Sequence, residues 1–182
     1  MKSETKETLY RGAGFFAGLV SAIPVHESGH WVVDYLSGGN PTFGINELGN
    51  FEVNATSYAL DNDPGKIAEV AAGGPLANYM AAIGLAGISK KINNAYAKEF
   101  IEGASLSQAI MPLAQALTQL SASYLNYKVT MHSGDFDEIS KYTGIPYGVI
   151  IPATALALLG ISRYLSKSKK EAIETKDKTN NP

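Results

Sequence analysis

Residues 25–36 have the sequence VHESGHWVVDYL, in which two histidines and a glutamate lie within an otherwise apolar run from about Gly12 to Leu36. The run is long enough for a helix that spans a bilayer, which takes roughly 20 residues. Burying a carboxylate and two imidazoles among apolar side chains costs several kcal/mol unless other groups satisfy them. The stretch therefore predicts a long helix that carries a polar functional group.

Three further apolar segments follow along the chain. The first, Ile67–Ile88, is interrupted by Gly73, Gly74 and Pro75, and the last, Gly148–Leu165, contains only one charged residue. The middle segment, Ala104–Leu125, is the least apolar, because it contains three glutamines and several serines. The four segments predict an all-α integral membrane protein with about four transmembrane helices.

The link between the first two segments has a different composition. It is rich in glycine and asparagine and contains residues typical of strands, namely Phe43, Ile45, Phe51, Val53 and Tyr58. We expect a small β-hairpin-like element there, with turns at Gly38–Pro41 and Leu48–Asn50. Residues 1–165 then form one membrane-embedded domain, and the polar residues 166–182 form a disordered tail.

Composition excludes several classes of site. The net charge of −2 does not indicate a nucleic-acid partner, and without cysteine the chain has no thiolate ligand, so a metal must be held by His, Asp or Glu. The mean hydropathy of −0.04 is ordinary for a soluble protein and low for a membrane protein.

Basic residues predict the topology of the four segments. The N-terminal arm, the second link and the C-terminal tail hold Lys2, Lys6, Arg11, Lys90, Lys91, Lys98, Lys167, Lys169 and Lys170, whereas the other two links hold only Lys66, Lys128 and Lys141. The positive-inside rule then places both termini in the cytoplasm. The N-terminal segment resembles a signal peptide, but cleavage near Ser21 and Ala22 would remove the helix leading into His26, so we expect it to be retained.

The sequence His26-Glu27-Ser28-Gly29-His30 fits the HExxH pattern. On a helix, residues four apart share a face, so both histidines can bind one zinc ion. Glu27 lies beside them, where it can take a proton from a zinc-activated water. HExxH also occurs by chance, but ionisable groups within an apolar span are usually functional.

A catalytic zinc ion usually has three protein ligands, so a third ligand must come from elsewhere in the chain. The residues alone leave several candidates open: His132, Glu47, Glu52, Asp61, Asp63, Glu69, Asp135, Asp137 and Glu138.

The HESGH sequence at the end of an apolar helix, followed by GGPLANYM at 73–80, resembles the site-2 proteases, which are intramembrane zinc metalloproteases. Gly29 matches the glycine of the family's HExGH, and Gly74, Pro75 and Asn78 match its Gly-Pro-x-x-Asn element. The family's usual Asn-Pro-x-x-x-x-Leu-Asp-Gly string is absent. Instead, MHSGDFDEISKYTGIP at 131–146 is similar to a compact branch of the family.

The resemblance implies roles for two more residues. Asp135 would be the third zinc ligand, with Ile139 and Thr143-Gly144-Ile145-Pro146 following it, and Asn78 would orient the substrate backbone. In simpler interpretations, Asp135 caps a helix through Glu138 to Tyr142, and Asn78 hydrogen-bonds to a neighbouring helix. Relatives use a strand edge after the HExGH helix to hold an unwound substrate; here the link at 41–60 would be that edge or an ordinary connector.

Together these features predict a multi-pass membrane zinc endopeptidase. Glu27 would be the base, and His26, His30 and Asp135 would bind Zn²⁺. The expected partners are a membrane protein substrate and the lipid bilayer. A regulatory membrane protein is a further candidate partner. Two alternatives are a soluble compact zincin and a non-catalytic membrane scaffold or metal-binding protein.

Overall fold

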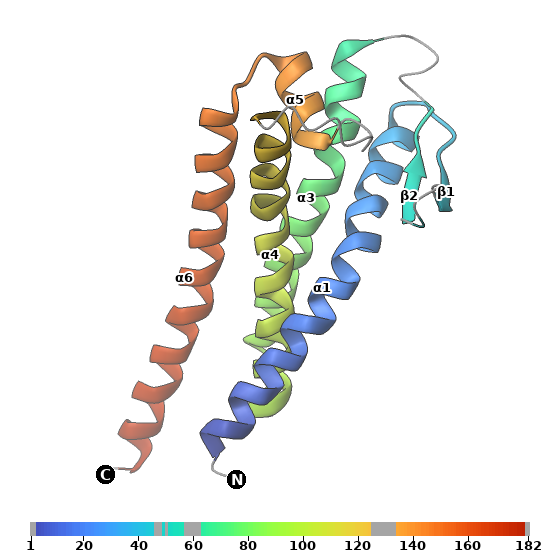
Figure 1. The fold of residues 1–182 in the computed structure, drawn as a ribbon. Coiled ribbons are helices and arrows are strands. Elements are labelled where there is room, and N and C mark those ends of the chain that lie inside the picture. The colour runs from blue at the N-terminus through green and yellow to red at the C-terminus, as the bar shows by residue number, and fades with distance from the viewer. Residues whose placement is uncertain (1–2, 46–48, 50, 57–62, 125–133, 181–182) are drawn as a thin grey trace.

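The computed structural model describes residues 3–45, 49, 51–56, 63–124 and 134–180, with the backbone alone for 123–124 and 168–180. Four long helices lie side by side, a short helix lies at one end of the bundle, and a hairpin follows the first helix (Figure 1). Both chain termini lie at the opposite end. In chain order the elements are α1 (Ser3–Leu36), β1 (Thr42–Ile45), β2 (Phe51–Asn54), α3 (Pro64–Ser89), α4 (Ala95–Tyr124), α5 (Asp135–Thr143) and α6 (Tyr147–Asn180).

The predicted mostly helical fold with a hairpin after the first helix is confirmed, and two details differ. α3 continues through Gly73, Gly74 and Pro75, because packing against α1 outweighs the one backbone hydrogen bond that an internal proline removes. α6 continues to Asn180, so most of the predicted disordered tail is helical. The tail is rich in lysine, glutamate and alanine, which favour helix once a preceding helix supplies the nucleus.

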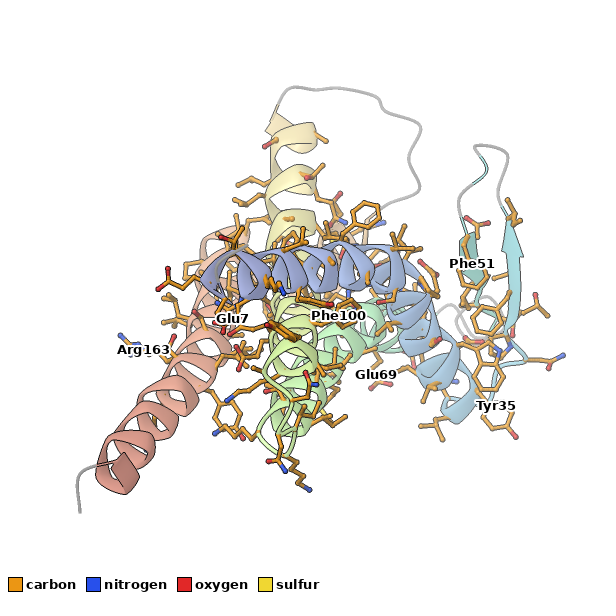
Figure 2. The ribbon with its side chains drawn as sticks, turned by 90° about the horizontal axis from the view of Figure 1, so that it is seen from below. Glu7, Tyr35, Phe51, Glu69, Phe100 and Arg163 are labelled. Carbon is orange, nitrogen blue, oxygen red and sulfur yellow. The ribbon has the colours of Figure 1, made fainter. Side chains whose placement is uncertain are left out.

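Small residues let α1 and α4 approach closely. Gly14, Gly18 and Ala22 recur at every fourth position of α1 and are all buried. A Cβ atom at Gly14 would overlap the backbone of Phe100, and one at Gly18 would overlap the hydroxyl of Ser107. Figure 2 shows Phe100 where α1 crosses α4. Such spacing of small residues is typical of helix pairs in membranes.

Many of the side chains inside the bundle are small, beside a few large ones such as Ile150, Ile161 and Leu165, and many large apolar side chains face outward. Its buried residues include Ala22, Ala82, Ala86, Ala109 and Ala116, together with the polar Ser105, Ser107 and Gln108. Large apolar side chains are exposed on all four long helices, among them Leu9, Phe16, Val20, Ile23, Leu76, Met80, Ile83, Leu117, Val149, Leu156 and Leu159. A water-soluble bundle normally has the opposite arrangement, with leucine and isoleucine at the helix contacts.

Hydropathy alone supports fewer spans than the four predicted. Among the described residues, one helical stretch, Tyr147–Lys167, combines the length of a span with a mean hydropathy of 1.6 and few charges. Core helices of soluble proteins also pass this test. The predicted segments on α1, α3 and α4 are helical but do not reach this hydropathy.

The hairpin is antiparallel, with Phe43 opposite Val53, and the C-terminal turns of α1 hold it. The buried carboxylate of Asp34 accepts a hydrogen bond from the Thr56 amide, 3.1 Å to Oδ2. Trp31 Nε1 donates to the Pro41 carbonyl at 3.1 Å. Aromatic rings stack from α1 onto both strands in the order Tyr35, Trp31, Phe43 and Phe51 (Figure 2). These contacts fix β2 beside the HExxH motif.

Candidate metal centre

The two histidines of the motif lie one turn apart on α1 and point toward the same place. Their Nε2 atoms are 3.1 Å apart, and His30 is buried. Both rings pack against the backbone of α3 at Gly74. A Cβ atom there would lie 2.5 Å from the Nε2 atoms of both histidines, so only glycine leaves room for the imidazoles.

α5 brings Asp135 to this pair. Its Oδ2 lies 2.7 Å from His26 Nε2, and its Oδ1 lies 3.2 Å from His30 Nε2. Asp135 does not cap α5, because Gly134 is the N-cap and Asp135 is the first helical residue. The matched Thr143-Gly144-Ile145-Pro146 sequence ends the same helix, with Gly144 in the left-handed conformation at φ 73°.

The Nδ1 atom of each histidine, the ring nitrogen that does not face Asp135, also has a polar neighbour. His30 Nδ1 lies 2.6 Å from the Val70 carbonyl oxygen, which can only accept a hydrogen bond, so Nδ1 carries a proton. His26 Nδ1 lies 3.3 Å from the side-chain amide of Asn78. With Oδ1 of that amide turned toward His26, it accepts a hydrogen bond from a protonated Nδ1, as a histidine that binds a metal through Nε2 requires. With both Nδ1 atoms protonated, both Nε2 atoms present lone pairs.

Two imidazole lone pairs and one carboxylate therefore converge at one partly buried point. Three acceptors so close together repel one another unless protons or a metal ion lie between them. Burial raises the pKa of Asp135, but when His26 and His30 carry protons on Nε2, their hydrogen bonds to the carboxylate outweigh burial and hold its pKa well below the usual range. Ligands of tetrahedral zinc at about 2.0–2.2 Å are roughly 3.3–3.6 Å apart. The site thus fits zinc after a small outward shift of its ligand atoms.

Glu27 lies beside this point. One of its carboxylate oxygens is within 4.8 Å of a ring nitrogen of each histidine. Its Oε2 accepts a hydrogen bond of 2.9 Å from the Val53 amide, so the outer edge of β2 holds the carboxylate. A cavity of about 380 Å³ opens here, lined by residues that include His26, Glu27, His30, Val53 and Asp135. The Glu27 carboxylate therefore lies at the wall of an open cavity, beside the two histidines.

The other predicted ligands occupy different positions. Glu52 and Glu138 line the cavity, Asp137 accepts a hydrogen bond from the Tyr147 hydroxyl, Asp63 caps α3, and Glu69 is exposed. Glu47, Asp61 and His132 lie outside the described residues.

The predicted role of Asn78 was to contact the substrate. In the structure its side chain is 1% exposed and contacts His26 on α1. Asn78 is therefore placed to orient a histidine, and its hydrogen bond crosses between two helices, as its simpler interpretation expected.

Sequence reasoning missed two glutamines of α4 that hold the Asp135 segment. Gln115 Nε2 donates to Asp135 Oδ2 at 2.7 Å, and Gln119 Oε1 accepts from the Phe136 amide at 2.9 Å. The side chain of Gln119 lies where a Cβ atom at position 134 would project, so any residue other than glycine there would displace it. The sequence did contain one indication of this pair. Two polar residues that lie four positions apart in an apolar helix are on the same face of that helix.

Comparison of the chain with models of known protein families, with curated proteins and with solved structures finds no match. The resemblance to the site-2 proteases therefore rests on the sequence motifs alone.

Proposed function

We propose that this protein is an intramembrane zinc endopeptidase of the site-2 protease type. The observation that carries the proposal is the convergence of His26 Nε2, His30 Nε2 and the Asp135 carboxylate on one point. Glu27 lies at the side of that point, at the wall of a cavity. These are the donors and the base that metal-assisted peptide hydrolysis requires.

The chain's own residues divide the work of hydrolysis. His26, His30 and Asp135 would hold the zinc ion, and Asn78, Val70 and Gln115 would orient those ligands. When bound, zinc supplies a Lewis acid that lowers the pKa of a water molecule to about 7. Glu27, held by the Val53 amide, would take a proton at its carboxylate and return it to the leaving amine.

The surface of the bundle supports a membrane environment for this site. Large apolar side chains are exposed on all four long helices, most of them on α1, α3 and α6, whereas alanine, glycine, serine and glutamine make many of the helix contacts. Both termini lie at one end (Figure 1), as an even number of spans requires. On this placement the protein is a multi-pass membrane protein with cytoplasmic termini, and its substrate is a membrane-embedded or juxtamembrane protein.

A second candidate is a water-soluble compact zincin with the same site. It is favoured by the finding that a single described stretch has the hydropathy of a span. The two candidates differ in where the protein is found after cell lysis. The membrane candidate requires detergent for extraction from the membrane fraction, and the soluble one does not.

The first experiment measures zinc content by mass spectrometry on purified protein. We expect about one zinc ion per chain in the wild type, much less in Asp135→Ala, and an unchanged amount in the control Asp137→Ala, whose carboxylate is hydrogen-bonded to Tyr147. A well-folded wild type that takes up no added zinc would refute the proposal.

The second experiment tests catalysis with the membrane-reconstituted protein. A library of single-span peptides is incubated with wild type and with Glu27→Gln, and cleavage products are identified by mass spectrometry. We expect products with the wild type and none with Glu27→Gln, although both bind zinc. Zinc binding with identical product profiles in the two proteins would favour the non-catalytic scaffold.

A further inference from the structure

A second hollow in the bundle lies between α3 and α6, away from the histidines. It is a groove of about 420 Å³ lined by Tyr79, Ile83, Ala86, Ala157, Gly160, Ile161 and Tyr164. Apart from the tyrosine hydroxyls, these side chains are apolar. A Cβ atom built at Gly160 meets nothing within 4 Å, so the wall of α6 is open at this position.

Polar contacts between the two helices mark both ends of the groove. At the end nearer the metal centre, the Tyr79 hydroxyl donates to the Thr154 carbonyl at 3.2 Å. At the other end, Lys90 Nζ lies 3.3 Å from the centre of the Tyr164 ring. Lys90 is the C-cap of α3, so at 1.5 Å per residue it lies about 16 Å along α3 from Tyr79, one turn beyond Ala86, the last α3 residue that lines the groove.

The Lys90 end of the groove carries positive charge. Lys90 is followed by Lys91, and the turn at 90–94, KKINN, has no acidic residue. The turn lies at the same end of the bundle as the two chain termini (Figure 1). On the proposed placement this is the cytoplasmic end, where the lipid surface is anionic.

The size of the groove limits what it can hold. A helix about 10 Å wide and about 16 Å long has a volume of roughly 1,200 Å³, so most of a substrate helix would protrude from the groove. A single extended hydrocarbon chain is narrow enough to fit. An apolar groove that ends at a lysine matches a ligand with an apolar chain and an anionic head.

We propose that the groove between α3 and α6 binds one acyl chain of an anionic phospholipid, whose phosphate contacts Lys90. The proposal rests on the membrane placement adopted for the proposed function, and it does not depend on zinc or on catalysis. A lipid in this position fills the space between α6 and the rest of the bundle.

The test is native mass spectrometry of the full chain in a mild detergent, after reconstitution in vesicles of equal parts phosphatidylglycerol and phosphatidylcholine. We expect the wild type to retain one phosphatidylglycerol. Gly160→Leu fills the groove and should reduce retention about tenfold or more, since each displaced CH₂ contact contributes about 0.8 kcal/mol. Its control is Gly148→Leu, an equally open position of α6 outside the groove.

The headgroup contact has its own pair of variants. Lys90→Gln should weaken the preference for phosphatidylglycerol about fivefold, as expected for one lysine near an anionic surface, and Lys91→Gln should change it less. If Gly160→Leu does not fold, Ala157→Leu fills the same groove.

The outcomes separate this proposal from the proposed function. Equal retention in Gly160→Leu and Gly148→Leu, retention of a second copy of the chain in place of a lipid, or an unchanged preference in Lys90→Gln would each overturn the lipid site. A protein that retains the lipid but binds no zinc would refute only the peptidase. A protein that needs no detergent and retains no lipid would refute both the groove and the membrane placement.

Discussion

Replacing Gln115 by methionine should weaken zinc binding without removing a zinc ligand. Methionine has a similar volume but cannot donate the 2.7 Å hydrogen bond to Asp135 Oδ2. A hydrogen bond to a charged group contributes roughly 1.5–3 kcal/mol, and loss of an outer partner of a metal ligand typically costs about 10- to 100-fold in affinity. Because Gln119 still holds the Phe136 amide at 2.9 Å, we expect the lower part of that range, about 10- to 30-fold.

The assay is competition for zinc with a chromophoric chelator in detergent, supported by the visible spectrum of the cobalt-substituted protein. The matched control is Gln108→Met on the same helix, where Nε2 donates to the Gly18 carbonyl at 3.0 Å. That change should lower the free energy of unfolding by about 1–3 kcal/mol and leave the zinc affinity of the folded protein unchanged. If folded Gln115→Met binds zinc as tightly as the wild type, Gln115 does not position Asp135.

Three further predictions follow from contacts around the site. Asn78→Leu should lower zinc affinity about tenfold in the chelator assay, whereas Asn78→Asp, which keeps an acceptor oxygen, should retain most of it. Asp34→Ala leaves the Thr56 amide without its acceptor, and should cost about 1–3 kcal/mol in the local stability of the hairpin, seen as faster cleavage by an added protease. Gly18→Val should lower the free energy of unfolding in denaturant by roughly 1–3 kcal/mol, because its Cβ overlaps α4, whereas Gly12→Val, where a Cβ meets nothing within 4 Å, should have little effect.

The sequence was most informative where the pattern is local. The spacing of His26 and His30 on a helix predicts a shared face, and the structure has both Nε2 atoms 3.1 Å apart. The turn residues around Gly38 and Gly49 predict a hairpin, and both glycines have positive φ. Such features depend on backbone geometry within a few residues, which is why a single sequence suffices for them.

Features that depend on contacts between distant segments could not be predicted in the same way. The choice of Asp135 among several carboxylates depends on how α5 packs against α4, and the sequence offered it only through a family resemblance. The hydrogen bond from Gln115 depends on the same packing. Gly74 was recognised as part of a motif, but its function as the space for two imidazoles requires the position of α1 against α3.

Part of the low hydropathy of α4 is explained by where its polar residues lie. Ser105, Ser107 and Gln108 lower the hydropathy of α4, yet their exposed fractions are 0%, 0% and 1%. The Ser105 hydroxyl donates to the Ala82 carbonyl of α3, and Gln108 Nε2 donates to the Gly18 carbonyl of α1, so both donors have their partners within the bundle. A hydropathy window counts such residues as if they faced the surroundings, although in a bilayer only exposed side chains meet lipid. Among the exposed side chains of α4 are Leu117, Thr118 and Ser121, whereas α1 and α3 expose more large apolar side chains, such as Phe16, Val20, Leu76 and Met80. In α4, therefore, part of the low hydropathy belongs to the interior of the bundle, whereas the low average of the whole chain owes more to the polar residues 166–182.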